Sequence, residues 1–321
     1  MSKKIVIMPT FCEAHLIKHQ IPNIIDTIEP DYIIYNEGMF PTGPENTTNV
    51  DEKFLNEYTL DGKRGFDFEE LQEIIHEAQK KYKDTKIILN KMEYPEGMYD
   101  VMDCWYEASS NFDKLGINVE VGDYIFPYES DVFHHEDSKE EIQSYLQQLK
   151  PNTGFRSTWI DFVENQFYAF KSTLKPFLKE EWVDQGRSRR ICIKFGDWDW
   201  YKQVLGGLMT QQYPMLYPTD LITYHYVWWR PEKYKKMRFA QLNRGDNFWE
   251  TFESACENIK SLKYNEIRVY PGPKHLTSKW IKFHDIKHPK HIKKHENYLG
   301  NVAESVVNLL NNSLEVVDGV E

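Results

Sequence analysis

Up to about residue 130, the chain alternates between two patterns of apolar residues. Short runs that are apolar almost throughout predict buried strands at 3–9, 31–37, 86–92 and 123–129. Between these runs, apolar residues spaced three and four positions apart predict amphipathic helices at 13–27, 67–83 and about 99–115. Alternation of strands and helices is typical of a mostly parallel sheet flanked by helices, so we expect an α/β fold of the Rossmann-like kind.

The later part of the chain follows this alternation less strictly. The pattern predicts helices at 138–149, 199–210 and 231–243, and strands near 189–195 and 220–229. The stretch 38–66 is polar and rich in Gly, Pro and Asn, which predicts a long loop. Neither a GxGxxG nor a GxxxxGK[ST] motif occurs, which argues against a dinucleotide dehydrogenase and against a P-loop enzyme.

Composition and charge narrow the class of protein. The net charge of −11 does not favour binding of nucleic acid over the whole surface, although a local basic patch could still bind it. The four cysteines are far apart, with neither a zinc-binding spacing nor a disulfide pattern, which indicates a reducing compartment. The sequence has no signal-peptide pattern and no run of about 18 apolar residues that could form a membrane helix, so we expect a cytoplasmic protein.

Two acidic residues, Glu129 and Asp131, follow the fourth predicted strand. They stand at its carboxyl end, and in open α/β sheets ligands bind beyond the carboxyl ends of the strands. Carboxylates there can hold Mg²⁺ or Mn²⁺, which also take phosphate oxygens, and such a cation stabilises the charge on a leaving diphosphate. An acidic pair is also common in an ordinary solvated turn, so the interpretation depends on the neighbouring residues.

The surrounding segment, GDYIFPYESDVFHHE at 122–136, resembles the acidic signature of GT-A glycosyltransferases of family 2 and of related bacterial and viral enzymes. Asp131 matches the central metal-binding acid. Glu129 takes the first acidic position in place of Asp, and Val132 stands where some relatives carry a second acid. The resemblance implies a metal-dependent transferase that moves a hexose or pentose from a UDP- or GDP-linked donor to a saccharide or another hydroxyl acceptor.

The resemblance extends to the first two predicted strands. The segment IVIMPTFCEAHLIKHQIPNII, at 5–25, is similar to the opening strand and helix of the family. By this resemblance Thr10 lies near the nucleotide base, and Glu13 binds base or ribose or else stabilises the helix N-terminus. In IIYNEG, at 33–38, Asn36 and Glu37 face the nucleotide or form a polar strand end.

A second polar constellation is TYHYVWWR at 223–230. Some GT-A enzymes carry a similar segment, in which the histidine completes the metal coordination and a basic group contacts the diphosphate. The resemblance therefore implies that His225 is a third metal ligand and that Arg230 is a phosphate contact. An imidazole ligand suits Mn²⁺ better than Mg²⁺.

A general base is needed if the transfer inverts configuration. The segment GDWDWY at 196–201 offers Asp197 and Asp199 beside tryptophans, which could bind an acceptor sugar and raise the pKa of the base. We favour Asp199. The alternative is a surface turn in which an aspartate caps a helix, and Asp161 and Glu164 are rival bases.

The segment 274–298 is rich in Lys and His. It could neutralise a donor diphosphate, bind a polyanionic acceptor, contact nucleic acid or form a solvated basic surface. Its part FHDIKHP, at 283–289, resembles a tail of some related transferases, which favours a structural role.

The resemblance implies that the chain is divided into two parts. We expect a GT-A-like nucleotide-sugar-binding and catalytic domain at 1–230, and a C-terminal helical and basic extension at 231–321 that packs on it. Two other functions stay open. One is a viral or phage enzyme that glycosylates DNA bases in the host cytoplasm. The other is a non-catalytic, sugar-binding member of the same fold.

Overall fold

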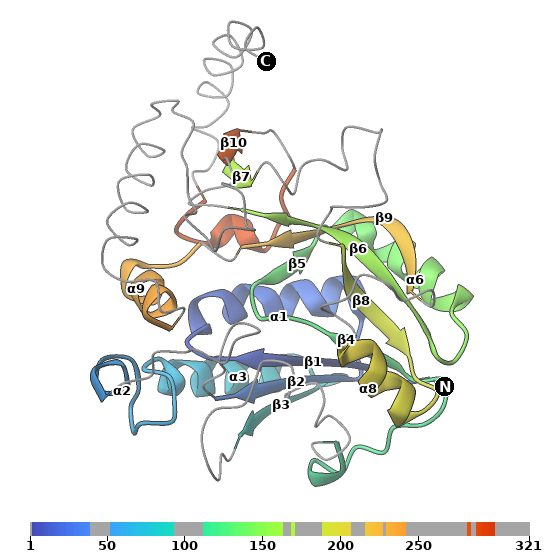
Figure 1. The fold of residues 1–321 in the computed structure, drawn as a ribbon, viewed down its shortest axis with the longest axis horizontal. Coiled ribbons are helices and arrows are strands. Elements are labelled where there is room, and N and C mark those ends of the chain that lie inside the picture. The colour runs from blue at the N-terminus through green and yellow to red at the C-terminus, as the bar shows by residue number, and fades with distance from the viewer. Residues whose placement is uncertain are drawn as a thin grey trace, which may run out of the picture.

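A computed structural model describes residues 2–38, 52–92, 112–162, 168–170, 188–206, 216–226, 229–241, 281–283 and 287–298. Its centre is an eight-stranded sheet with the strand order β3-β2-β1-β4-β8-β6-β9-β5 (Figure 1). The strands of this sheet are β1 (Lys4–Thr10), β2 (Tyr32–Glu37), β3 (Lys86–Lys91), β4 (Tyr124–Pro127), β5 (Val132–His134), β6 (Thr153–Asp161), β8 (Ser188–Lys194) and β9 (Leu216–His225).

The first four strands of the sheet run parallel, which brings their carboxyl ends to one edge. In the register, Thr10 is paired with Glu37 and Glu37 with Lys91, while Ile7 is paired with Pro127. Alternate residues of β1 enter two different cores, and β1 is buried from Ile5 to its end. Burial on both faces explains why these strands read as continuous apolar runs.

The second half of the sheet contains strands of both directions. β8 runs antiparallel to β4 and to β6, β6 and β9 are parallel, and β5 is antiparallel to β9. Four of the seven neighbouring strand pairs are therefore parallel. The reversal of β8 matters for the site, because it places the end of β8 beside the start of β4.

Helices cover both faces of the sheet, which confirms the predicted α/β, Rossmann-like fold. One core contains apolar residues of three helices, and α1 contributes Ile17, Ile21, Ile24 and Ile28 at helical spacing. The other core includes Tyr201 of α8. The helices are α1 (Ala14–Ile28), which contains Pro22, and α3 (Phe68–Lys81) and α6 (Lys139–Gln148) on the first face, with α8 (Trp198–Gly206) on the second.

Two predictions are corrected by the fold. The predicted loop 38–66 contains the helix α2 (Glu52–Tyr58), whose Phe54 and Tyr58 pack with Met237 of α9 (Glu232–Gln241). The last predicted strand ends at His225 rather than at 229, and a backbone hydrogen bond from Trp229 to Tyr226 marks a turn there. The predicted helix at 99–115 lies mostly outside the described residues.

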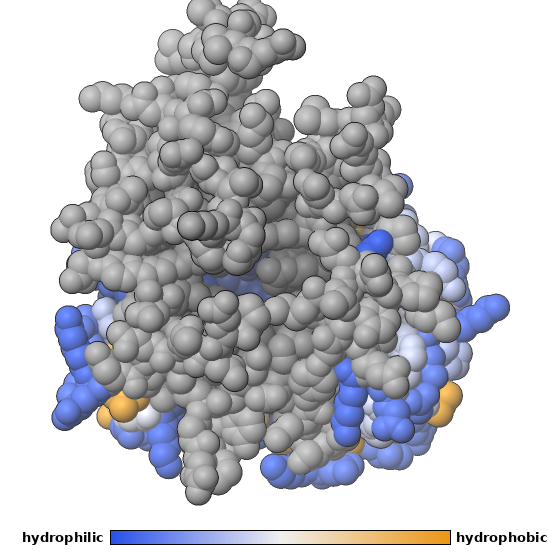
Figure 2. Space-filling view, viewed as in Figure 1, coloured by the Kyte–Doolittle hydropathy of each residue, from blue (hydrophilic) through white to orange (hydrophobic). Residues whose placement is uncertain are grey.

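The remaining described elements are short. β7 (Tyr168–Phe170) and β10 (Ile281–Phe283) form a separate antiparallel pair, and two 3₁₀ turns occur at η1 (Glu136–Ser138) and η4 (Ile292–Lys294). In Figure 2 the described side chains along the lower flanks are mainly hydrophilic, with scattered hydrophobic ones. Among the described residues, no helix combines the length and the apolar character needed to cross a membrane.

Candidate metal centre

Glu129 and Asp131 stand on the turn that joins β4 to β5. The turn is closed by a hydrogen bond of 3.3 Å from the backbone N–H of Val132 to the carbonyl of Glu129. β5 then pairs with β9, and Val132 lies opposite His225 in the register. The sheet pairing thus brings the histidine at the end of β9 to the acidic turn.

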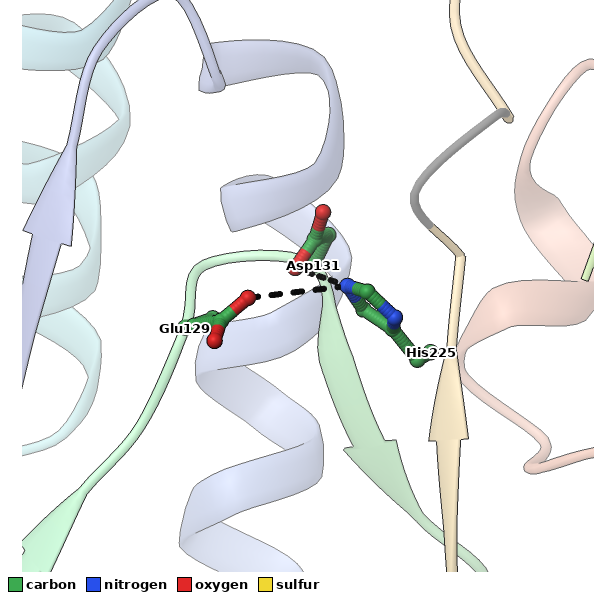
Figure 3. Close-up of side chains that lie close together, drawn as sticks. All are labelled: Glu129, Asp131 and His225. Atoms are coloured by element: carbon green, nitrogen blue, oxygen red, sulfur yellow. Dashed lines mark ion pairs between the residues drawn. The ribbon is translucent and has the colours of Figure 1, made fainter. Parts of the chain in front are cut away.

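The side chains of Glu129, Asp131 and His225 point toward one another (Figure 3). The Nε2 atom of His225 lies 3.2 Å from Oδ1 of Asp131 and 3.7 Å from Oε2 of Glu129. One ligand atom from each residue lies within 4.8 Å of the others, a spacing that could hold a metal ion. The side chains of Asp131 and His225 are each 5% exposed and that of Glu129 is 24% exposed, so the group is accessible mainly through Glu129.

Arg230 lies behind this group and joins it to the loop after β1. Its Nη1 atom donates to Oε2 of Glu13 at 2.6 Å, and its Nη2 atom donates to Oδ2 of Asp131 at 3.0 Å. Burial lowers the pKa of the Arg230 guanidinium, but the Glu13 and Asp131 carboxylates outweigh burial, so the pKa is raised. Arg230 therefore fixes one carboxylate oxygen of Asp131 and leaves Oδ1 directed toward His225.

The cluster is rich in acidic groups. Three carboxylates, from Glu13, Glu129 and Asp131, lie close to the guanidinium of Arg230 or to the imidazole of His225. Buried charges are costly unless they are paired or coordinate a metal. Two carboxylates with one imidazole form a donor set that suits Mn²⁺. The residues present therefore fit the metal that the sequence implies.

The predicted nucleotide contacts Thr10, Asn36 and Glu37 all stand at the carboxyl ends of β1 and β2. Thr10 is paired with Glu37, and Pro9 is paired with Asn36. The Thr10 hydroxyl is buried and has no hydrogen-bond partner among the described residues. The Oδ1 atom of Asn36 accepts a hydrogen bond of 2.8 Å from Asn90.

Glu37 is held by a residue that the sequence analysis missed. The Nη1 atom of Arg64 lies 3.0 Å from Oε2 of Glu37 and also donates to the carbonyls of Glu37 and Met92, while the N–H of Gly65 donates to Oε1 of Glu37. Burial is the main cause that raises the pKa of Glu37 to about 7. Arg64 lies in the stretch interpreted as a loop, where the local pattern carries no signal of this partner.

Asp197 and Asp199 follow the end of β8, at the opposite edge of the sheet from the acidic turn, so their role as the general base stays a prediction that this position does not favour. Because β8 is antiparallel to β4, its last residue is paired with Tyr124 at the start of β4. An extended chain rises about 3.3 Å per residue, so roughly 20 Å along β4 separates its start, which lies beside the end of β8, from the acidic turn that follows it. In Figure 1, α8 lies near the N-terminus, whereas α9 lies on the opposite side of the molecule.

The carboxylate of Asp197 caps α8 instead. Its Oδ1 atom accepts from the N–H of Trp200 at 2.7 Å, and its Oδ2 atom accepts from Asn152 at 2.7 Å. Of the two rival bases, Asp161 is paired with His225 in the parallel register of β6 and β9. Glu164 lies outside the described residues.

The described part of the basic segment 274–298 contacts other parts of the protein. Asp26 on α1 lies 2.7 Å from Nζ of Lys290 and 2.8 Å from Nε2 of His291. The Nζ atom of Lys287 lies 2.9 Å from Asp137. These ion pairs agree with the structural role that the sequence resemblance favours.

Comparison with known proteins gives distant matches in structure and none in sequence. The sequence matches no protein-family model and no curated protein. One similar solved structure is 4-diphosphocytidyl-2C-methyl-D-erythritol synthase, with a TM-score of 0.34 and 9% identity, covering 68% of this chain and 90% of that chain. Another is the mannosyltransferase PcManGT from Pyrobaculum calidifontis in complex with GDP-Man and Mn²⁺, with a TM-score of 0.35 and 13% identity, covering 83% of this chain and 65% of that chain.

Proposed function

We propose that the protein is a metal-dependent glycosyltransferase that uses a UDP- or GDP-linked sugar donor. The observation that carries this proposal is the cluster of Glu129, Asp131 and His225 at the carboxyl edge of the sheet. The same three positions match the metal ligands of GT-A enzymes in the sequence resemblance. Two carboxylates and an imidazole gathered at an α/β ligand edge favour a divalent cation whose remaining ligands come from a diphosphate.

The three residues would hold Mn²⁺ or Mg²⁺, and the bound cation would stabilise the negative charge of the departing diphosphate. Arg230 keeps the Asp131 carboxylate in place through a bond of 3.0 Å and adds a positive charge near the diphosphate. Glu129 is the most exposed member of the cluster and stands where the donor would enter.

The nucleotide would bind across the carboxyl ends of β1 and β2. The buried Thr10 hydroxyl has no hydrogen-bond partner in the described part of the chain and could bond the base, while Asn36 and Glu37 are oriented by Asn90 and Arg64. Glu13 is held by Arg230, which favours its role in ordering the loop that precedes α1. These contacts are proposals that follow from position and from the sequence resemblance.

We assign the general base of an inverting transfer to Asp161. Its backbone is paired with His225, so it stands at the same sheet edge as the metal ligands. A base must lie within hydrogen-bond reach of the acceptor hydroxyl, and this register position meets that need better than the start of α8 does.

The acceptor is proposed to be a saccharide or another small hydroxyl compound. Lys287, Lys290 and His291 of the basic segment are already paired with acidic side chains of the protein, which weakens the argument for a DNA acceptor. Retention of the protein on DNA at low salt would favour the DNA alternative.

A thermal-shift screen of nucleotide sugars with and without Mn²⁺ tests the proposal. We expect Mn²⁺ to stabilise the protein, one donor to stabilise it further, and the metal-loaded protein to hydrolyse that donor slowly. Glu129→Gln should lose these effects while keeping the Arg230 contacts, and Glu77→Gln, on the exposed face of α3, should retain them. Absence of both Mn²⁺-dependent stabilisation and donor hydrolysis in the wild type would refute the proposal.

A further inference from the structure

Gln20 is a fully buried amide on α1, next to Ile17, Ile21 and Ile24, which pack into the sheet. Its Nε2 atom donates to the carbonyl of Glu129 at 2.8 Å and to the carbonyl of Val132 at 3.1 Å. These two carbonyls bracket Asp131. One side-chain amide thus spans the turn that carries both carboxylates of the metal centre.

A buried hydroxyl lies on the other side of this amide. The hydroxyl of Tyr35, on β2, lies 3.4 Å from Oε1 of Gln20, a long contact that favours the orientation in which both N–H groups face the turn. A buried amide is costly unless its polar atoms are hydrogen-bonded. Gln20 meets most of that cost through its two bonds to the carbonyls of Glu129 and Val132.

Asp131 is held from outside the turn by two other bonds: its carbonyl accepts from the N–H of Tyr226 at 2.9 Å, and its carboxylate accepts from Arg230 at 3.0 Å. Gln20 adds a bond to the backbone of Glu129, at the other end of the turn. The turn itself contributes little. Its own closing bond, from the N–H of Val132 to the carbonyl of Glu129, is 3.3 Å long, which is beyond the usual range for such bonds. Metal ligands must be held within fractions of an ångström to bind well. The spacing between the Glu129 and Asp131 carboxylates therefore depends on bonds that come from outside the turn.

We propose that Gln20 is a positioning residue of the metal centre, which sets the spacing of the Glu129 and Asp131 carboxylates and so raises the affinity for the cation. This inference rests on the proposed function, because it needs a cation at this cluster. Gln20 does not touch the cation; it acts through the backbone of its ligands. Residues of this kind commonly change metal affinity by about 10- to 100-fold.

The helix also supplies a matched control. Asn23 is buried three positions further along α1 and makes a similar pair of bonds, but to the backbone of His134: its Nδ2 atom donates to the carbonyl at 2.7 Å, and its Oδ1 atom accepts from the N–H at 2.9 Å. His134 lies beyond the acidic turn. Loss of Asn23 should loosen β5 against α1 without changing the spacing of the carboxylates.

The test compares Gln20→Met with Asn23→Leu in the full chain, with Mn²⁺ alone as the probe. Both variants should lower the midpoint of thermal unfolding. Titration calorimetry at a temperature where both are folded should give a Kd for Mn²⁺ raised about 10- to 100-fold in Gln20→Met and close to that of the wild type in Asn23→Leu. If Gln20→Met does not fold, Tyr35→Phe removes only the hydroxyl that orients the amide and should raise the Kd in the same direction.

The outcomes separate this inference from the proposed function. An unchanged Kd in Gln20→Met or Tyr35→Phe, or equal losses in Gln20→Met and Asn23→Leu, overturns the positioning role while Glu129→Gln still loses Mn²⁺. A wild-type protein that binds no Mn²⁺ overturns the metal centre itself, and this inference with it.

Discussion

Arg230 donates to Asp131 at 3.0 Å although 99 positions separate the two residues. The same guanidinium reaches Glu13, 217 positions away, at 2.6 Å. One side chain therefore connects the loop before α1, the acidic turn after β4 and the segment after β9. This contact gives Arg230 a structural task beyond the phosphate contact that the sequence resemblance implies.

Removal of Arg230 should destabilise the fold strongly. Arg230→Met removes a guanidinium that pairs with the buried carboxylates of Glu13 and Asp131, and breaking such a buried pair costs about 3–5 kcal/mol. Urea denaturation should show this loss, and the double variant with Glu13→Gln should recover part of it, because one of the two carboxylates that lost the guanidinium is then neutral. Arg230→Lys should also have a lower free energy of unfolding than the wild type, since an ammonium cannot form the two-pronged contact.

An unchanged free energy of unfolding would favour a role of Arg230 in donor binding alone. If Arg230→Met keeps the wild-type free energy of unfolding and only weakens donor binding, Arg230 serves the diphosphate rather than the two carboxylates.

Asp161 should matter for turnover and Asp199 should not. Loss of a general base lowers turnover by about 10²- to 10⁴-fold. Asp161→Asn should show such a loss in a steady-state assay with the identified donor and acceptor, with an unchanged Kd for Mn²⁺, whereas Asp199→Asn should behave as the wild type. The reverse pattern would instead support the prediction made from the sequence around 196–201.

Asp197 should contribute to stability through its cap of α8. Asp197→Ala removes the acceptor of the Trp200 N–H and should lower the midpoint of thermal unfolding. Asp197→Asn should have a midpoint close to that of the wild type, because asparagine caps helices as well as aspartate does. Mn²⁺ affinity should be the same in both variants. A loss of metal binding in Asp197→Ala at a temperature where it is folded would contradict the separation of α8 from the metal centre.

Buried histidines should make the fold sensitive to acid. Burial is the main cause that lowers the pKa of His295 to about 3 and that of His19 to about 4, and nearby cations act in the same direction. As the pH falls below 6.5, the ordinary value, the unfolded chain takes up protons that the folded chain does not, so stability falls. This contribution is fully present above pH 6.5 and is lost progressively toward the folded values.

The difference between variant and wild type isolates this effect, because burial also raises the pKa of Glu37 to about 7, which acts in the opposite direction. His295→Gln should reduce the slope of unfolding free energy against pH, between about pH 5 and 6.5, by up to about 1.4 kcal/mol per pH unit. A slope in His295→Gln equal to that of the wild type would contradict this account.

Much of the parallel half could be predicted from the sequence, since its signals are local. Strands buried on both faces require continuous apolar runs, and the runs at 3–9, 31–37 and 86–92 correspond closely to β1, β2 and β3. Glu129 and Asp131 could be predicted as a pair because they are two positions apart on one turn. The resemblance of the segment 223–230 to other GT-A enzymes added His225 to the predicted metal ligands.

The positions of the strands and helices in the parallel half follow from the sequence, because hydrophobic periodicity acts over neighbouring residues. The direction of β8, which places Asp197 and Asp199 at the edge opposite the acidic turn, could not be predicted in this way, and neither could the contacts of Arg230 and Gln20 with that turn. Strand pairing and buried hydrogen bonds join residues that are distant in the chain. Their geometry is settled by packing the whole sheet, and no local pattern of residues records it.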